Sequence, residues 1–210
     1  MKLVAIALLA IARTAVADPA SKPAIEPPPD PAATRAGDAN LETLEQRRGY
    51  TFSIVAGPSL TFGADVGTGG ALSLRMGQVA TASTVVSFEL NGSAVFHSVE
   101  DPANPDAPGR LVANSNTTLL AGVQHWVNPS LSLRLAVGGG RYRCNECGPP
   151  DGSGMRTTEK YAGAAGSFGA GIDLVRWGSL VVGLELHSVT LFTLDGMLSN
   201  NSFGLALSVD

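Results

Sequence analysis

Apolar side chains recur at every second position over most of this chain, which is the period of a β-strand and not of a helix. In residues 180–187, LVVGLELH, one face carries only Leu and Val, while the other includes Gly183, Glu185 and His187. The alternation is less regular in residues 116–127. Overall it predicts an all-β fold of about eight antiparallel strands, near residues 50–62, 70–78, 82–97, 111–126, 130–143, 157–175, 179–193 and 201–209.

The composition of the two faces indicates what each one meets. The less apolar face is rich in Gly, Ala and Ser, and the whole chain has 25 glycines and only 6% aromatic residues. A face in water would normally carry many Lys and Glu. No segment beyond residue 17 is apolar enough over the roughly 20 residues that a membrane helix needs. A chain that spans a membrane without helices must close into a barrel, so we expect an antiparallel up-and-down transmembrane β-barrel.

The interior of an eight-stranded barrel is just wide enough for side chains. Charged side chains that point inward must pair there, because an unpaired buried charge is very costly. We therefore expect a plugged lumen with an ion-pair cluster, formed by Arg75, Glu89, Arg134, Asp173, Glu185 and His187. The alternative is a soluble, exported, lipocalin-like binding barrel, which would need an apolar interior.

The connections between the predicted strands sort into two kinds. Short turns are expected near Gly77–Ser83, Asn128–Ser130 and Trp177–Ser179. Longer polar loops are expected near Gly63–Gly70, Ser98–Arg110, Cys144–Arg156 and Leu194–Asn200. The two kinds alternate, as they do in outer-membrane barrels with short periplasmic turns and long extracellular loops. Trp126 and Trp177 lie next to short turns and are predicted to belong to an interfacial aromatic girdle.

The N-terminus predicts export. Lys2 precedes an apolar run, residues 3–12, and Ala15-Val16-Ala17 reads as a signal-peptidase site. The sequence thus divides into a signal peptide at 1–17, a Pro/Ala-rich linker with a possible short helix at 18–48, and a barrel at 49–210. Cleavage would leave 12 of the 14 basic residues against 18 acidic ones, a net charge of −6. That balance argues against a nucleic-acid partner.

Cys144 and Cys147 form a C-x-x-C motif, and the chain has only these two cysteines. Such a motif can be redox-active or form half of a zinc site. In an oxidising compartment a local disulfide is the simpler interpretation, and free thiols or a metal site are the alternatives.

Two His-Ser pairs, His97–Ser98 and His187–Ser188, are the candidates for nucleophilic catalysis. A triad needs a Ser hydroxyl within reach of the His and a carboxylate that orients the ring. Adjacent residues on a strand point to opposite faces, so neither pair forms a dyad by itself. No phosphate loop and no metal-spaced His/Cys cluster is found in the sequence. We predict no catalytic residue, cofactor or metal.

Residues 50–210 resemble the small outer-membrane β-barrel family, the group with OmpA-like and OmpX-like barrel domains. The resemblance rests on the alternation, the sorted connections and the signal peptide, so it supports fold and location more than activity. The last strand, Ser202–Val209, is similar to the signal that the barrel-assembly machinery reads, although that family usually ends on an aromatic residue and this chain ends Val209-Asp210.

The resemblance implies a place in the outer membrane of a Gram-negative envelope. It also implies outer-membrane lipid, lipopolysaccharide and the barrel-assembly machinery as partners, with an unknown surface ligand at the loops. The function expected is a non-enzymatic structural or surface-interaction role. The alternative is a lipid A-modifying enzyme of the deacylase or acyltransferase type, because some barrels of this kind are such enzymes.

Overall fold

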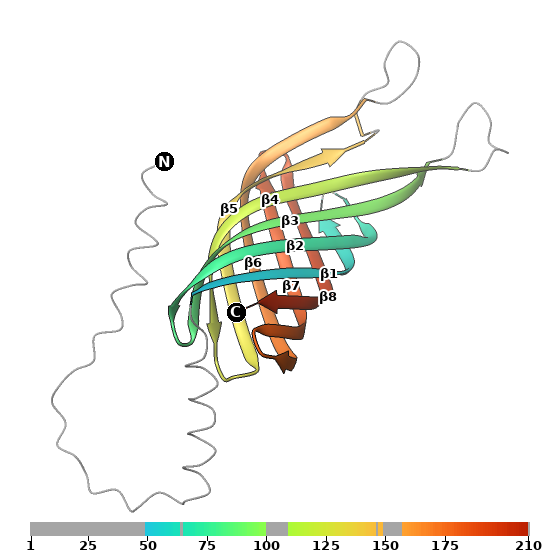
Figure 1. Ribbon diagram of the computed structural model, residues 1–210. Helices are drawn as coiled ribbons and strands as arrows, with labels where there is room; N and C mark the ends of the chain where they lie inside the picture. The colour runs from blue at the N-terminus through green and yellow to red at the C-terminus, as the bar shows by residue number, and fades with distance from the viewer. Residues whose placement is uncertain (1–48, 64, 100–108, 146, 149–156, 210) are drawn as a thin grey trace, which may run out of the picture. The chain divides into compact units, whose positions relative to one another are not determined.

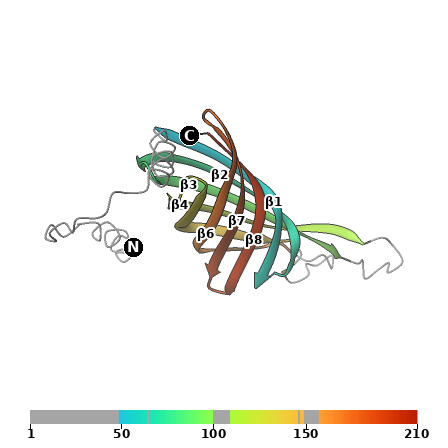
Figure 2. The ribbon, with the colours of Figure 1, turned by 90° about the horizontal axis from the view of Figure 1, so that it is seen from below.

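The computed structural model describes residues 49–63, 65–99, 109–145, 147–148 and 157–209. They form eight strands: β1 (Tyr50–Gly63), β2 (Gly67–Thr81), β3 (Thr84–Val99), β4 (Arg110–Trp126), β5 (Leu131–Cys144), β6 (Glu159–Trp177), β7 (Leu180–Thr193) and β8 (Gly196–Val209). Each strand is antiparallel to the next (Figure 1). Figure 2 shows β1 and β8 side by side, where their pairing closes the barrel. The predicted all-β, eight-stranded up-and-down fold is confirmed.

The predicted signal peptide and linker, residues 1–48, lie outside the described residues. Within the part of the chain that is described, no helix is long and apolar enough to cross a membrane.

The two faces of each strand meet different surroundings. Along β3, Ser87, Glu89 and Asn91 are buried, while the intervening Phe88 and Leu90 are exposed. The same period holds in the other strands, because successive side chains point to opposite faces of a sheet. The buried positions include many Ser, Asn and charged residues, whereas the exposed positions carry most of the large apolar side chains. In the described residues the interior therefore holds polar and charged side chains beside smaller apolar ones, while the exterior is apolar, the reverse of what a lipocalin-like soluble barrel requires.

Two of the four connections predicted to be long are short. β2 begins at Gly67 and β8 at Gly196, so residues 64–66 and 194–195 make these connections. The glycines of 67–70 belong to β2, and one of them, Gly69, allows close backbone contact with β3. A Cβ atom added at Gly69 would lie 1.7 Å from the Ala94 carbonyl oxygen. The connections at 100–109 and 145–158 remain long.

The barrel has two distinct ends. The short-turn end carries the connections at 82–83, 127–130 and 178–179, and the loop end carries the other four. At the loop end, the β3–β4 and β5–β6 hairpins extend beyond the neighbouring strands (Figure 1). Residues 96–99 of β3 pair with β4 alone, because the register with β2 starts at Val95. The sites described below lie inside the barrel and at its loop end.

Candidate functional site

Five of the six predicted lumen residues meet inside the barrel and form what we call the lumen cluster, which consists of Arg75, Glu89, Arg134, Glu185 and His187. Arg134 holds both acids, since its Nε lies 2.7 Å from Glu89 Oε1 and its Nη2 lies 2.7 Å from Glu185 Oε1. Arg75 donates a second contact to Glu185. The two cations and two carboxylates balance, and β2, β3, β5 and β7 each supply one of them.

The lumen cluster is almost completely removed from solvent. The side chain of Glu89 is 0% exposed and that of Arg134 is 3% exposed. His187 Nε2 lies 3.8 Å from Glu89 Oε2 on the loop side of the cluster. Charges buried this deeply are tolerated only when each has a partner of opposite sign. The contacts therefore hold four strands in one arrangement across the lumen.

A small cavity lies directly on each side of the lumen cluster, among the residues that the structure describes. On the loop side, Asn91, Asn116, His187 and Asn200 line a space of about 20 Å³. On the short-turn side, Thr51, Arg75, Gln124 and Asp173 line a space of about 30 Å³. Spaces of this size hold roughly one water molecule each.

Asp173, the sixth predicted member, is not part of the lumen cluster. Gly171 is the residue of β6 that pairs with Glu185, so Asp173 lies one inward position nearer the short-turn end. Its carboxylate faces Arg176, with Oδ2 and Nη2 3.6 Å apart. The alternation of the sequence correctly predicts that Asp173 faces the lumen. The stagger between the strands, however, places it nearer the short-turn end of the barrel than the lumen cluster.

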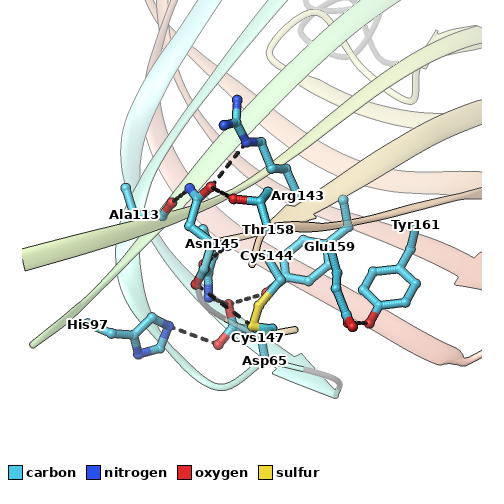
Figure 3. The surroundings of a disulfide bond; sticks show 12 residues. Asp65, His97, Ala113, Arg143, Cys144, Asn145, Cys147, Thr158, Glu159 and Tyr161 are labelled. Atoms are coloured by element: carbon cyan, nitrogen blue, oxygen red, sulfur yellow. Dashed lines mark hydrogen bonds and ion pairs between the residues drawn. A yellow bond between two sulfur atoms is a disulfide. The ribbon is translucent and has the colours of Figure 1, made fainter. Parts of the chain in front are cut away.

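A second polar arrangement, missed from the sequence, closes around Asp65 at the loop end (Figure 3). We call it the mouth network, and it consists of Asp65, His97, Asn114, Tyr142 and Asn145. Asp65 Oδ2 accepts hydrogen bonds from the Tyr142 hydroxyl at 2.7 Å and from Asn114 Nδ2 at 3.0 Å. His97 Nε2 lies 2.9 Å from Asp65 Oδ1. The carboxylate thereby ties the β1–β2 connection to three other strands.

The predicted disulfide between Cys144 and Cys147 is confirmed. It bends the chain at the end of β5, where Asn145 donates its backbone N–H to Asn114 Oδ1 at 2.9 Å (Figure 3). Cys144 packs in a buried apolar cluster with Tyr142, Leu191 and Leu198. Because the covalent bridge and the mouth network meet at Asn145, the start of the β5–β6 connection is fixed to the barrel.

The two tryptophans occupy different positions. Trp177 is 63% exposed on the outer face beside the β6–β7 turn. Trp126 is only 6% exposed and lines the inner cavity at the short-turn end. The prediction that Trp126 belongs to an outward girdle is wrong. The irregular alternation of 116–127 hid its inward orientation, which follows from the pairing Trp126↔Ser132.

Neither His-Ser pair forms a catalytic dyad in the described residues. His187 faces Glu89 inside the barrel, whereas Ser188 is on the other face of β7. His97 meets Asp65, and Ser98 is exposed on the opposite face of β3. The imidazole that contacts a hydroxyl is that of His125, whose Nδ1 lies 3.0 Å from Thr84 Oγ1. That pair lies at the short-turn end, away from both candidates.

No protein-family model and no curated protein matches the chain. Solved structures do match. One is the attachment invasion locus protein Ail of Yersinia pestis, solved in complex with the heparin analogue sucrose octasulfate. Its sequence is 12% identical to this chain, its TM-score is 0.57, and the match covers 77% of this chain and 99% of Ail. Neisserial surface protein A is 8% identical with a TM-score of 0.50, over 77% of this chain and 96% of that one. The chain has the fold of the small outer-membrane β-barrels.

Proposed function

We propose that this protein is an exported, integral outer-membrane β-barrel with a plugged lumen, which acts without catalysis as a structural or surface-interaction protein. Its loop end faces the cell exterior, where the β3–β4 and β5–β6 hairpins contact a surface ligand. The signal peptide at 1–17, a linker at 18–48 and a barrel from residue 49 remain part of this proposal. So do delivery by the barrel-assembly machinery and contact with outer-membrane lipid.

The inverted distribution of polarity supports the membrane assignment. Leu135 and Phe168, which pair across β5 and β6, are 65% and 51% exposed, while Arg134 on the same strand is buried. Apolar side chains on an outer face are stable in lipid and costly in water. The likeness to Ail, which was solved in complex with a heparin analogue, supports a search for a surface ligand.

The lumen cluster supports the plugged state. An ion would have to pass between Arg134 and its two carboxylate partners, which lie 2.7 Å from it, and the cavities that adjoin the lumen cluster measure about 20 and 30 Å³. The protein reconstituted in a planar bilayer should give no steady conductance. Steady single-channel steps from purified protein would refute a plugged lumen.

Membrane insertion has its own test, which uses the two tryptophans. In vesicles of brominated phosphatidylcholine, the exposed Trp177 should be strongly quenched and the buried Trp126 spared. The Trp177→Phe variant should therefore lose most of the quenching. Equal quenching of both tryptophans, or a protein that stays soluble without detergent and shows no heat-dependent shift on a gel, would refute the barrel's placement in lipid.

The Asp65–His97 contact is the one observation that favours a lipid-modifying enzyme. A carboxylate that orients an imidazole is two-thirds of a triad, and this pair lies at the loop end. Release of fatty acid from lipid A by the wild-type protein, abolished in His97→Ala, would establish that alternative. Equal and negligible release from both proteins is expected if the pair only fastens the mouth network.

A further inference from the structure

Three cations gather on the outer face of the barrel at the loop end. Arg141 and Arg143 are outward residues of β5, and Lys160 is an outward residue of β6. These three residues, the basic patch, are three of the seven Lys and Arg residues in the described part of the chain. Together with Ser115, Thr117 and Tyr142 they line a pocket of about 160 Å³. The pocket combines positive charge with two hydroxyl donors.

Within the described ranges, the positive charges of the basic patch are not balanced by neighbouring acids. Arg143 and Lys160 are direct cross-strand partners, and like charges placed opposite each other destabilise a sheet. Among the described residues, no acid forms an ion pair with any of the three cations. Arg143 donates instead to the neutral Asn145 Oδ1, at 3.1 Å, and the neighbouring Glu159 points inward to Tyr161. An external anion would relieve this repulsion.

A shallow apolar groove joins the basic patch. Its volume is about 430 Å³, and its outward lining consists of Gly70, Leu72, Gly92, Ala94, Ser115 and Thr117. Ser115 and Thr117 line both the groove and the basic pocket. The strand register explains the continuity, because Gly92 pairs with Thr117 and Thr117 pairs with Arg141 along one rung of the sheet. The groove and the patch are thus two halves of one surface.

This surface sits at the edge of the apolar outer face. Toward the short-turn end, the outward residues that follow Arg141 on β5 are Gly139, Val137 and Leu135, with no further charge. Under the proposed function, on which this inference rests, that edge is level with the headgroups of the outer leaflet. A lipid there presents phosphate to the cations and acyl chains to the groove.

We infer that the basic patch and the adjoining groove bind one molecule of a phosphorylated glycolipid of the outer leaflet, of the lipopolysaccharide class. The guanidinium groups of Arg141 and Arg143 and the ammonium group of Lys160 hold its phosphate, with Ser115 and Thr117 donating hydrogen bonds. One acyl chain lies in the groove over Gly70 and Gly92. A soluble sulfated glycan or free phosphate would use the cations alone and leave the groove empty.

The first experiment tests the role of charge by comparing lipid A retention after neutralising each of two cationic residues of β6. Full-length mature protein is reconstituted in phosphatidylcholine nanodiscs with a small fraction of bisphosphorylated lipid A, and retained lipid A is counted by native mass spectrometry. Lys160→Gln should weaken retention about tenfold, as expected for loss of one charge-assisted contact. Arg176→Gln, which removes a cation at the other end of the same strand, should retain lipid A as the wild type does.

The second experiment tests the role of the groove by comparing lipid A retention after substitution of two outward glycines that have room for a side chain. A Cβ atom at Gly92 would meet nothing within 4 Å, and one at Gly166 would approach only the Ala136 carbonyl oxygen, at 3.8 Å. Gly92→Leu should fill the groove and lower lipid A retention several-fold, whereas Gly166→Leu on the lipid-facing side of β6 should not. Heat-dependent gel mobility verifies that both variants fold.

The inference fails if Lys160→Gln or Gly92→Leu retains lipid A like the wild type. It also fails if sucrose octasulfate or inorganic phosphate displaces the bound molecule while lipid A shows no preference over phosphatidylcholine. Either result leaves the proposed function standing, because the barrel would still insert in lipid. Failure of insertion itself would instead appear earlier, as the absence of heat-dependent mobility and of Trp177 quenching.

Discussion

Replacing Arg134 by Met removes the cation that contacts both acids of the lumen cluster. Glu89, whose side chain is 0% exposed, would lose its contact at 2.7 Å and keep only His187 at 3.8 Å. Glu185 would still contact Arg75. Breaking a buried pair by removing one partner costs about 3–5 kcal/mol. We expect Arg134→Met to lower the free energy of unfolding by that amount.

The double variant Arg134→Met/Glu89→Gln separates the ion pair from side-chain packing. It removes one charge of each sign and leaves Arg75 paired with Glu185. Since no uncompensated carboxylate remains, the double variant should be more stable than Arg134→Met by about 0.5–3 kcal/mol, the range of coupling between contacting residues.

The measurement is a reversible urea titration of the protein folded in phosphatidylcholine vesicles, followed by tryptophan fluorescence and gel mobility. Arg176→Met is the matched control. Its partner Asp173 is 3.6 Å away and both side chains are partly exposed, so the loss should stay below about 1 kcal/mol. A similarly small loss for Arg134→Met, or a double variant no more stable than Arg134→Met, would refute the view that paired charges stabilise the lumen.

Three further predictions address the outer face, the sheet and the loop end. Leu135→Lys should cost about 2–4 kcal/mol in vesicles, because it places a charge in lipid; a loss near zero in the same titration would contradict a lipid-facing strand. Gly69→Ala should reduce the heat-modifiable fraction, since its Cβ would clash with a backbone oxygen, whereas Gly70→Ala has open space and should fold normally; equal yields would refute the register. The Cys144→Ser/Cys147→Ser variant should lose about 2 kcal/mol or less of its free energy of unfolding, as expected when the disulfide closes a very short loop. Amide hydrogen exchange at the start of the β5–β6 connection should become faster. Unchanged exchange would show that the mouth network alone fixes this part of the chain.

The sequence by itself determined the strands and their two faces. The period of two is a local property, so the pattern of residues 180–187 correctly placed Glu185 and His187 inside and the leucines outside. The same period, with Ser and Gly on the other face, was enough to prefer a membrane barrel to a soluble one. The pairing of Cys144 with Cys147 also followed from local spacing.

Only the tertiary structure decided the depth at which each inward side chain lies. Depth depends on the stagger between strands, which is set by closure of β8 onto β1 and not by any single segment. That stagger brought Arg134 to both acids and left Asp173 outside the lumen cluster.

The mouth network and the groove with its basic patch could not be predicted from the sequence, because their residues lie far apart along the chain. Asp65 is a lone acid in a glycine-rich stretch, and its partner Tyr142 is 77 residues away. The groove and the basic patch combine outward residues of five adjacent strands, β2 to β6, that share rungs only after the sheet has formed. A local pattern tells which face a side chain takes, whereas strand register and barrel closure decide which side chains meet, because those contacts join residues far apart in the sequence.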